Sequence, residues 1–276
     1  MRLTTLATTV LVGLTGTALA QDSNSLSIEG ESMVTETEAP AHMENVDTIY
    51  SGWRFRSPET QALEMDDFDN PAFVFVDQAL DQFEEVDGSE GKACSSCHDG
   101  AEEFAGLRAV LPRVDNGELV TMEELINDCR TERMGAKPWK WSGGDMTAMT
   151  ALIGLQSRGM PVNVKIDGDA APFWERGKEL YYTRTGQLDL ACSNCHEDNY
   201  GVMIRADHLS QGQTNGFPTY RLKNAKLNSI HGRFLGCVRD TRATPYEEGS
   251  DEFKALELYL ASRGQGLSIE TPSVRN

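Results

Sequence analysis

Two copies of the motif CxxCH constrain this chain more than any other feature of its sequence. They occupy residues 94–98 and 192–196, so the copies lie 98 residues apart. Two cysteines at this spacing can bond to the two vinyl groups of one haem, and the adjacent histidine can then bind the iron. We therefore predict two covalently bound c-type haems, with His98 and His196 as iron ligands. The predicted covalent anchors are Cys94, Cys97, Cys192 and Cys195.

Other uses of paired cysteines fit this sequence less well. A zinc ribbon places its two CxxC elements roughly 15–20 residues apart, whereas these lie 98 residues apart. A thioredoxin-type pair sits in a βαβ unit, which the flanking sequence lacks, and does not require a histidine after both copies.

The flanks of the two motifs also repeat. Stretches with helical apolar spacing precede the motifs at residues 73–80 and 172–181, and Pro-containing loops follow them at Pro112 and Pro218. Each half ends on a helical stretch closed by Ser-Arg-Gly, and glycine is a common helix stop. We predict a mainly α protein of two tandem class I cytochrome c-like domains, related by internal duplication.

The N-terminus predicts export from the cytoplasm. Arg2 precedes an apolar stretch and then Ala18-Leu19-Ala20, which is typical of a cleaved signal peptide. We therefore expect a periplasmic protein that folds where thiols can oxidise. The predicted division is a signal peptide (1–20), a flexible tether (21–45), a first cytochrome c domain (46–165) and a second that holds the active site (166–276).

The charge of the chain restricts its partners. Lys+Arg number 25 and Asp+Glu number 43, which gives a formal net charge of −18. Nucleic acids and anionic membrane surfaces attract basic proteins, so neither is expected as a partner. No internal apolar run is long enough to predict a membrane span. An anionic substrate would need a local cluster of cations.

Two cysteines remain outside the motifs, one in each half. Cys129 and Cys237 follow His98 and His196 by 31 and 41 residues, where a monohaem cytochrome c usually supplies its distal methionine. We expect each cysteine to be the distal ligand of its haem. A thiolate ligand stabilises ferric iron and lowers the potential, which favours sulfur chemistry over electron carriage.

Other roles for these two cysteines stay open at this point. Cys129 and Cys237 could form a disulfide with each other, or could be inert buried thiols. Methionine or histidine could instead supply the distal ligands. The candidates are Met122, Met134, Met203, His208 and His231.

Arginines gather around Cys237. Arg233 lies four residues before it, which places both on one face of a helix, and Arg239 and Arg242 follow. A guanidinium group offers a planar fork of donors suited to an oxyanion. These arginines could bind a small sulfur oxyanion or the haem propionates.

These motifs together resemble the SoxA family, the dihaem cytochrome c subunits of the SoxAX complex of bacterial thiosulfate oxidation. The resemblance covers about residues 46–270. Besides the two CxxCH motifs, the matching stretches are Ser51-Gly52-Trp53-Arg54-Phe55, Pro58-Glu59-Thr60-Gln61-Ala62, residues 66–71, Lys137-Pro138-Trp139-Lys140-Trp141, and Arg233-Phe234-Leu235-Gly236-Cys237 with Arg239, Arg242 and Pro245-Tyr246.

The resemblance implies an enzyme, an L-cysteine S-thiosulfotransferase. With the monohaem cytochrome SoxX, such a subunit couples thiosulfate oxidatively to a cysteine of the carrier protein SoxYZ and passes two electrons to an external cytochrome c. By position, Cys237 would be the active-site cysteine that carries a persulfide, Arg233 the substrate-binding arginine and Cys129 the distal ligand of the first haem. The main alternative is a non-catalytic dihaem electron-transfer cytochrome, and a weaker one is a dihaem peroxidase.

Overall fold

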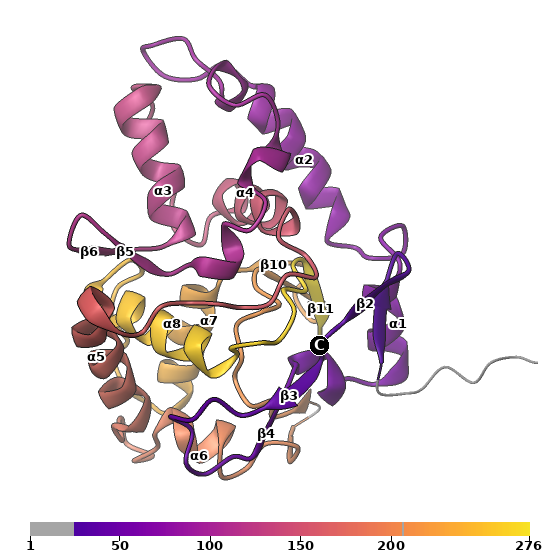
Figure 1. The fold of residues 1–276 in the computed structure, drawn as a ribbon, viewed down its shortest axis with the longest axis vertical. Coiled ribbons are helices and arrows are strands. Elements are labelled where there is room, and N and C mark those ends of the chain that lie inside the picture. Colours follow the sequence, from indigo (N-terminus) through magenta and orange to yellow (C-terminus); the bar gives the residue numbers. More distant parts are fainter. Residues whose placement is uncertain (1–24, 206) are drawn as a thin grey trace, which may run out of the picture.

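The computed structural model describes residues 25–205 and 207–276 of the chain (Figure 1). As predicted, helices dominate, and short strands connect them. The helices are α1 (Pro58–Met65), α2 (Phe73–Glu84), α3 (Met122–Asp128), α4 (Gly144–Leu155), α5 (Ala171–Tyr182), α6 (Cys192–His196), α7 (Ile230–Asp240) and α8 (Asp251–Arg263), with a π-helix, η5 (Cys129–Arg133), directly after α3. Within the described residues, no helix is long and apolar enough to cross a membrane.

The strands form small sheets at the ends of the chain and between the helices. The paired strands are β1 (Leu26–Ile28) with β2 (Glu31–Met33), β3 (Glu36–Glu38) with β4 (Thr48–Tyr50), β5 (Arg113–Asp115) with β6 (Glu118–Val120), and β7 (Met203–Ile204) with β8 (Asp207–His208). The remaining sheet has the order β10 (Lys226–Asn228), β9 (Thr219–Arg221), β11 (Ser273–Arg275), with β11 parallel to β9.

The first half is built on α2 packed against α4. Helix α2 buries Val76, Ala79 and Phe83, whose spacing of three and four residues makes one apolar face. Helix α4 is buried almost all round, which fits its small and apolar sequence. These two helices lie in the upper part of Figure 1 together with α3.

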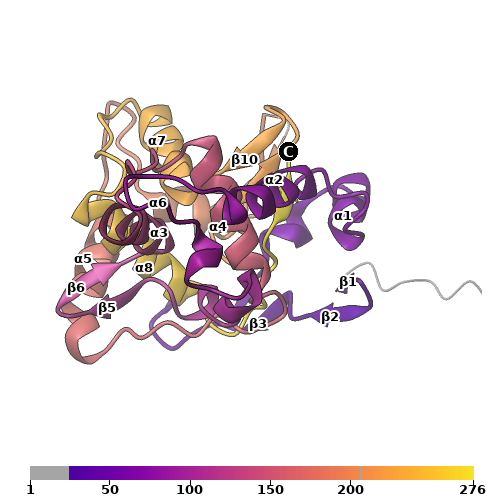
Figure 2. The ribbon, with the colours of Figure 1, turned by 90° about the horizontal axis from the view of Figure 1, so that it is seen from above.

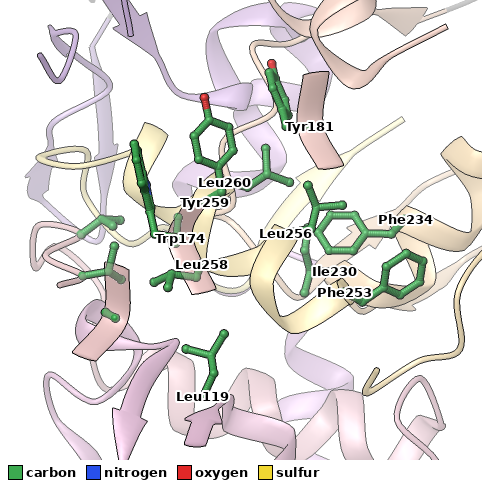
Figure 3. Packing of buried hydrophobic residues seen from close by; sticks show 14 of the residues in the cluster. Leu119, Trp174, Tyr181, Ile230, Phe234, Phe253, Leu256, Leu258, Tyr259 and Leu260 are labelled. Atoms are coloured by element: carbon green, nitrogen blue, oxygen red, sulfur yellow. The ribbon is translucent and has the colours of Figure 1, made fainter. Parts of the chain in front are cut away.

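The second half is built in the same way on α5 packed against α8. Trp174 and Tyr181 of α5 join Tyr259 and Phe253 of α8 in one buried cluster (Figure 3). The backbones approach so closely that a Cβ on Gly177 would lie 2.0 Å from the Ala255 carbonyl oxygen, so only glycine fits there.

The turns that lead into the two CxxCH motifs have the same hydrogen bonds. In each half, an isolated β-bridge closes the turn, and a side chain within the motif accepts a bond from the backbone just before it. The bridges are Asp87↔Lys92 and Thr185↔Leu190; the capping bonds run from Ala93 N to Ser96 Oγ (2.9 Å) and from Ala191 N to Asn194 Oδ1 (2.9 Å). Each feature recurs 98 residues along the chain.

The segment expected to be a flexible tether is folded wherever the structure describes it. Strands β1 and β2 form a hairpin that buries Leu26, Ile28 and Met33 against Trp53. The hairpin lies beside α1 at the edge of the molecule (Figure 2). Apolar residues alternate with polar ones in this hairpin and are buried, but the prediction of a tether followed the polar composition of the segment. The predicted signal peptide, residues 1–20, lies outside the described residues.

Both ends of the chain cross from one half to the other. The His42 ring packs edge-on against Trp174 of α5 at 5.3 Å, and Ile49 of β4 is buried with Leu267. At the other end, Arg275 of β11 forms an ion pair with Glu64 of α1. The predicted domain boundary at residue 165 therefore separates two halves of the sequence, but side chains pack across it.

Candidate functional site

The first CxxCH motif and Cys129 meet at one cavity. Cys94 begins a 3-10 helix, η2 (Cys94–Ser96), and Cys129 begins η5. Cys97, His98 and Cys129 line a cavity of about 590 Å³. The other lining residues are Lys92, Asp128, Glu132 and Arg133. Burial raises the pKa of Cys129, and the neighbouring Cys97 raises it further.

His98 is oriented by a carboxylate. Its Nδ1 lies 3.2 Å from Glu103 Oε2, and its side chain is 32% exposed. The Asp99 backbone N–H donates to the other oxygen of Glu103 at 3.0 Å. These two hydrogen bonds lower the pKa of Glu103, the backbone bond having the larger effect. With Nδ1 held in this way, Nε2 is the nitrogen available to a metal.

The second motif lies beside Cys237 in the same way. Residues Cys192–His196 form α6, and Cys237 lies in α7. Burial raises the pKa of Cys192 to about 12, and the neighbouring Cys237 contributes. Burial also raises the pKa of Cys195, again with a contribution from Cys237.

His196 is oriented by a backbone carbonyl instead of a carboxylate. Its Nδ1 lies 2.7 Å from the Ser210 carbonyl oxygen, so Nδ1 carries the proton and donates. Burial lowers the pKa of His196 to about 4, which keeps the ring neutral. A neutral histidine with a fixed Nδ1–H is the usual form of a metal ligand.

Buried polar groups near Cys192 fit a haem. Arg263 is completely buried, forms an ion pair with Glu197, and its charge lowers the pKa of Cys192. The Nε of Arg263 and the hydroxyl of Tyr181 have no hydrogen-bond partner among residues 25–205 and 207–276. Buried donors of this kind normally have an acceptor, and a haem propionate would supply one. The residues present therefore fit a covalently bound haem.

The structure excludes one of the roles left open for Cys129 and Cys237, a disulfide between them. Both are free thiols, and each lies beside the motif of its own half, so they do not form a disulfide with each other.

Several of the alternative distal ligands lie elsewhere. Met122 lines an interior cavity, and His231 is buried in the core beside Trp141. Met203 is 52% exposed and pairs with His208 across the β7–β8 hairpin. Met134 is buried directly after η5, where its backbone carbonyl accepts from Glu90 N.

Four cationic residues interact electrostatically with one another, and one of them, Arg221, also interacts with Cys237; we call the four the basic cluster. They are Arg205, Arg221, Lys223 and Arg233. Burial lowers the pKa of Arg221, as does the charge of Arg233, whereas Cys237 raises it. The pKa of Lys223 is lowered chiefly by Arg221.

The sequence identified only Arg233 of this cluster. Arg221 ends β9 and Lys223 lies in the turn to β10, both brought to α7 by packing rather than by a local spacing. Of the two arginines predicted after Cys237, Arg239 and Arg242 are both exposed. Arg239 Nε donates to the Leu235 carbonyl of its own helix at 3.1 Å.

Known proteins resemble this chain over most of its length. A family model described as SoxA/TsdA, cytochrome c domain, matches residues 78–162. The L-cysteine S-thiosulfotransferase subunit SoxA of Paracoccus pantotrophus is 58% identical over 99% of this chain and 97% of its own length. This chain belongs to the SoxA family.

Other SoxA proteins extend the comparison. The subunit from Rhodovulum sulfidophilum is also 58% identical, over 91% of this chain and 89% of its own length. The subunit from Chlorobaculum tepidum is 30% identical over 80% of this chain and 84% of its own length. The crystal structure of SoxXA from P. pantotrophus superimposes with a TM-score of 0.89 at 58% identity, covering 93% of this chain and 99% of that chain. The SoxA family is one of enzyme subunits with a cytochrome c domain, and such a domain holds covalently bound haem.

Proposed function

We propose that this SoxA-family chain is the catalytic dihaem subunit that couples thiosulfate to a cysteine of SoxYZ. The product is a cysteine S-thiosulfonate. The new bond joins the sulfurs of a thiol and a thiosulfate dianion, which together lose one proton and two electrons, and the electrons pass to an external cytochrome c. The observation that carries this proposal is the position of the Cys237 thiol, beside both a CxxCH motif and the basic cluster.

Each residue of the second site has a role in this proposal. Cys237 would be a ligand of a bound haem iron and, as the resemblance implies, the residue that carries a persulfide sulfur. Arg233, one helical turn before it, binds the thiosulfate oxyanion, and Arg221 and Lys223 add positive charge from β9 and its turn. The exposed Arg239 and Arg242 guide the anion or the partner toward the site. When bound, haem supplies a one-electron acceptor beside the reacting sulfur.

The basic cluster also answers the objection raised by the net charge of −18. Long-range repulsion of an anion is screened over about 8 Å at physiological ionic strength. Hydrogen bonds from Arg233 and its neighbours act within that distance. Binding of the anion at the basic cluster can therefore be favourable although the net charge of the protein repels it at long range.

We propose a second haem at the first site, held by Cys94, Cys97, His98 and Cys129. The cavity of about 590 Å³ that Cys97, His98 and Cys129 line supports it. The matching β-bridges and capping bonds, 98 residues apart, support two cytochrome c-like domains related by duplication, 46–165 and 166–276.

The proposed partners are SoxX, as a heterodimer, the carrier SoxYZ and an external cytochrome c. The similarity to the SoxXA structure from P. pantotrophus supports the first of these. The proposed location is the periplasm, reached through a signal peptide at residues 1–20, and the apolar stretch after Arg2 supports it.

The replacement Cys237→Ala tests the proposed function against a non-catalytic electron carrier. We expect it to lower the rate of coupling of thiosulfate to SoxYZ by about 10³-fold or more, as for loss of a catalytic nucleophile. The matched replacement Cys129→Ala should change the spectrum of the first site and retain at least about a tenth of the rate. Full coupling activity in Cys237→Ala would contradict the proposal. The measurement is the mass of SoxYZ after reaction with thiosulfate.

A further inference from the structure

Three titratable side chains are buried where the two halves meet. Glu123 of α3 is 4% exposed, Glu257 of α8 is 4% exposed, and His231 of α7 is completely buried. The surrounding core is apolar, and burial of a charged group costs free energy unless it is paired or neutralised. These three residues, which we call the interface cluster, are not part of either haem site.

His231 is fixed in one orientation and one tautomer. Its ring stacks on Trp141 at 5.2 Å with an interplanar angle of 14°. The Gly249 N–H donates to Nδ1 at 3.0 Å, so the proton of the neutral ring lies on Nε2. Nε2 faces Glu257 Oε2 at 3.2 Å, and neither atom has a hydrogen-bond partner among the described residues. The two atoms are therefore within ion-pair distance but lack the alignment of a hydrogen bond.

Glu123 and Glu257 face the same small cavity. Its volume is about 10 Å³, and Thr150, Ser229 and Arg108 also line it. That space admits about one water molecule, and the lining offers it polar partners. Burial raises the pKa of Glu123 to about 7, and repulsion from Glu257 contributes. Repulsion between two buried carboxylates at one cavity favours the protonated form of Glu123.

The remaining charged groups around the cluster have other partners. The Arg108 guanidinium donates to the carbonyls of Leu111 and Thr214 at 3.3 and 3.1 Å, and its charge lowers the pKa of Glu123. Lys254 of α8 is paired with Glu124 at 2.9 Å. Asp251 and Glu248 face Lys254 and Ser142, respectively. Neither Arg108 nor Lys254 forms an ion pair with Glu123 or Glu257 among the described residues.

The elements that carry the cluster also carry the two distal cysteines. Glu123 lies in α3, which continues directly into η5 and Cys129. His231 lies six residues before Cys237 in α7. A change of charge at either site is therefore linked to the cluster by shared helices, and electrostatic interactions with buried groups are weakly screened.

We propose that the interface cluster is a redox-linked proton site. It takes up one proton when the protein gains an electron and releases it when the electron leaves. The added negative charge favours the protonated carboxyl, and the proton comes from solvent. The proton taken up at the cluster offsets the negative charge of one added electron. The inference rests on the proposed haem loading but not on the proposed sulfur chemistry.

Infrared difference spectroscopy of the haem-loaded protein tests this directly, with a chemical reductant and no thiosulfate. Reduction should produce a carbonyl band of a protonated carboxyl group that shifts in D₂O. Glu123→Gln or Glu257→Gln should remove or displace this band. Between pH 6 and 8, the midpoint potential of the wild type should fall as the pH rises. In either variant, the midpoint potential should depend less on pH. Glu118→Gln, which removes an exposed carboxylate from β6, is the matched control and should behave as the wild type.

Two outcomes would overturn the proposal. One is a wild-type protein with no carboxyl band on reduction, a result that does not depend on any variant folding. The other is a band that survives unchanged in both Gln variants, which would assign it to a haem propionate. Either result can be obtained whether or not Cys237→Ala abolishes coupling, so the two proposals fail separately.

Discussion

The two CxxCH sites share their backbone frame and differ in the charges around it. The turn before each motif is closed by the same bridge, and a cysteine from a later helix lies beside each motif. In the first site, a carboxylate orients His98, and acids and bases both line the cavity. In the second site, a backbone carbonyl orients His196, Arg221 interacts with Cys237, and Arg233 lies in the same helix as Cys237.

The features that the two sites share would hold a haem, whereas the features that differ would determine its chemistry. The shared features are those that position two thiols and a histidine. In the proposed haem sites, the features that differ would set the electron density on the iron and determine which anion can approach the neighbouring cysteine. An anionic substrate is therefore expected at the second site, and the first site is expected to tune or store electrons.

The shared frame can be tested at two glycines. Gly88 and Gly186 have φ of +75° and +69°, and a Cβ on either would lie 2.1 Å from the carbonyl oxygen of Met134 or Thr241, respectively. We expect Gly88→Ala and Gly186→Ala each to lower the free energy of unfolding by about 3 kcal/mol, since both the conformation and the contact are unfavourable. Denaturant unfolding of the haem-loaded protein measures this.

Gly201→Ala is the control for the conformation alone. Its φ is +78°, but a Cβ there would meet nothing within 4 Å, so a loss of about 1 kcal/mol is expected. Equal losses at all three positions would show that the close contacts with Met134 and Thr241 contribute nothing.

The next effect concerns the cations of the second site alone. Arg233→Ala should lower kcat/KM for thiosulfate by about 10- to 100-fold, the scale of one lost charge-assisted hydrogen bond. Arg233→Lys should recover part of this loss, because lysine keeps the charge but not the planar fork. Steady-state coupling assays at fixed ionic strength measure both.

Arg184→Ala removes the same charge from an exposed position of the same half, where Arg184 donates to the Asp189 carbonyl. A change within about twofold is expected, since exposed charges are screened. A loss as large as that of Arg233→Ala would mean that the general field, not a specific contact, attracts the anion.

The parts of these sites that could be predicted from the sequence are those whose residues lie close together in the chain. The CxxCH motifs, the helices before them and the pairing of Arg233 with Cys237 on α7 all depend on residues close together in the chain. Arg221 and Lys223 reach the same place from a hairpin, and Glu123 and Glu257 meet His231 across three helices. No short pattern records such contacts, because long-range packing creates them.

One missed element did carry a local signal. Leu26 and Ile28 alternate with polar residues, and Glu29-Gly30, both with positive φ, form the turn to β2. Alternation around such a turn is typical of a β-hairpin. The serine- and glutamate-rich composition of residues 21–45 outweighed it in the prediction of a tether.

A smaller effect is expected from the carboxylate of the first site. Glu103→Gln removes the negative partner of His98 Nδ1, so the histidine donates less electron density to the iron. At a fixed ambient potential, the ratio of reduced to oxidised first haem should rise by up to about tenfold, while the second stays unchanged. A redox titration that resolves the two haems measures this, and equal shifts of both would contradict the independence of the sites.

The smallest effect concerns His42, which packs against the second half only. Burial lowers the pKa of His42 to about 4, and the charges of Arg263 and Lys178 contribute. As pH falls from about 6.5 to 4, the unfolded chain therefore binds a proton before the folded one, and stability is lost over that range.

His42→Gln separates this acid effect from the packing of the ring. Because His42 is only half-buried, we expect it to account for about 1 kcal/mol of the stability lost between pH 7 and 4.5, after allowance for solvent screening. His42→Gln should lose that much less on acidification, although it starts less stable at pH 7, where the contact with Trp174 is missing. The exposed His208 supplies the control, since His208→Gln should follow the wild type at both pH values. Parallel pH profiles for wild type and His42→Gln would mean that the acid sensitivity of the second half lies elsewhere than in this N-terminal contact.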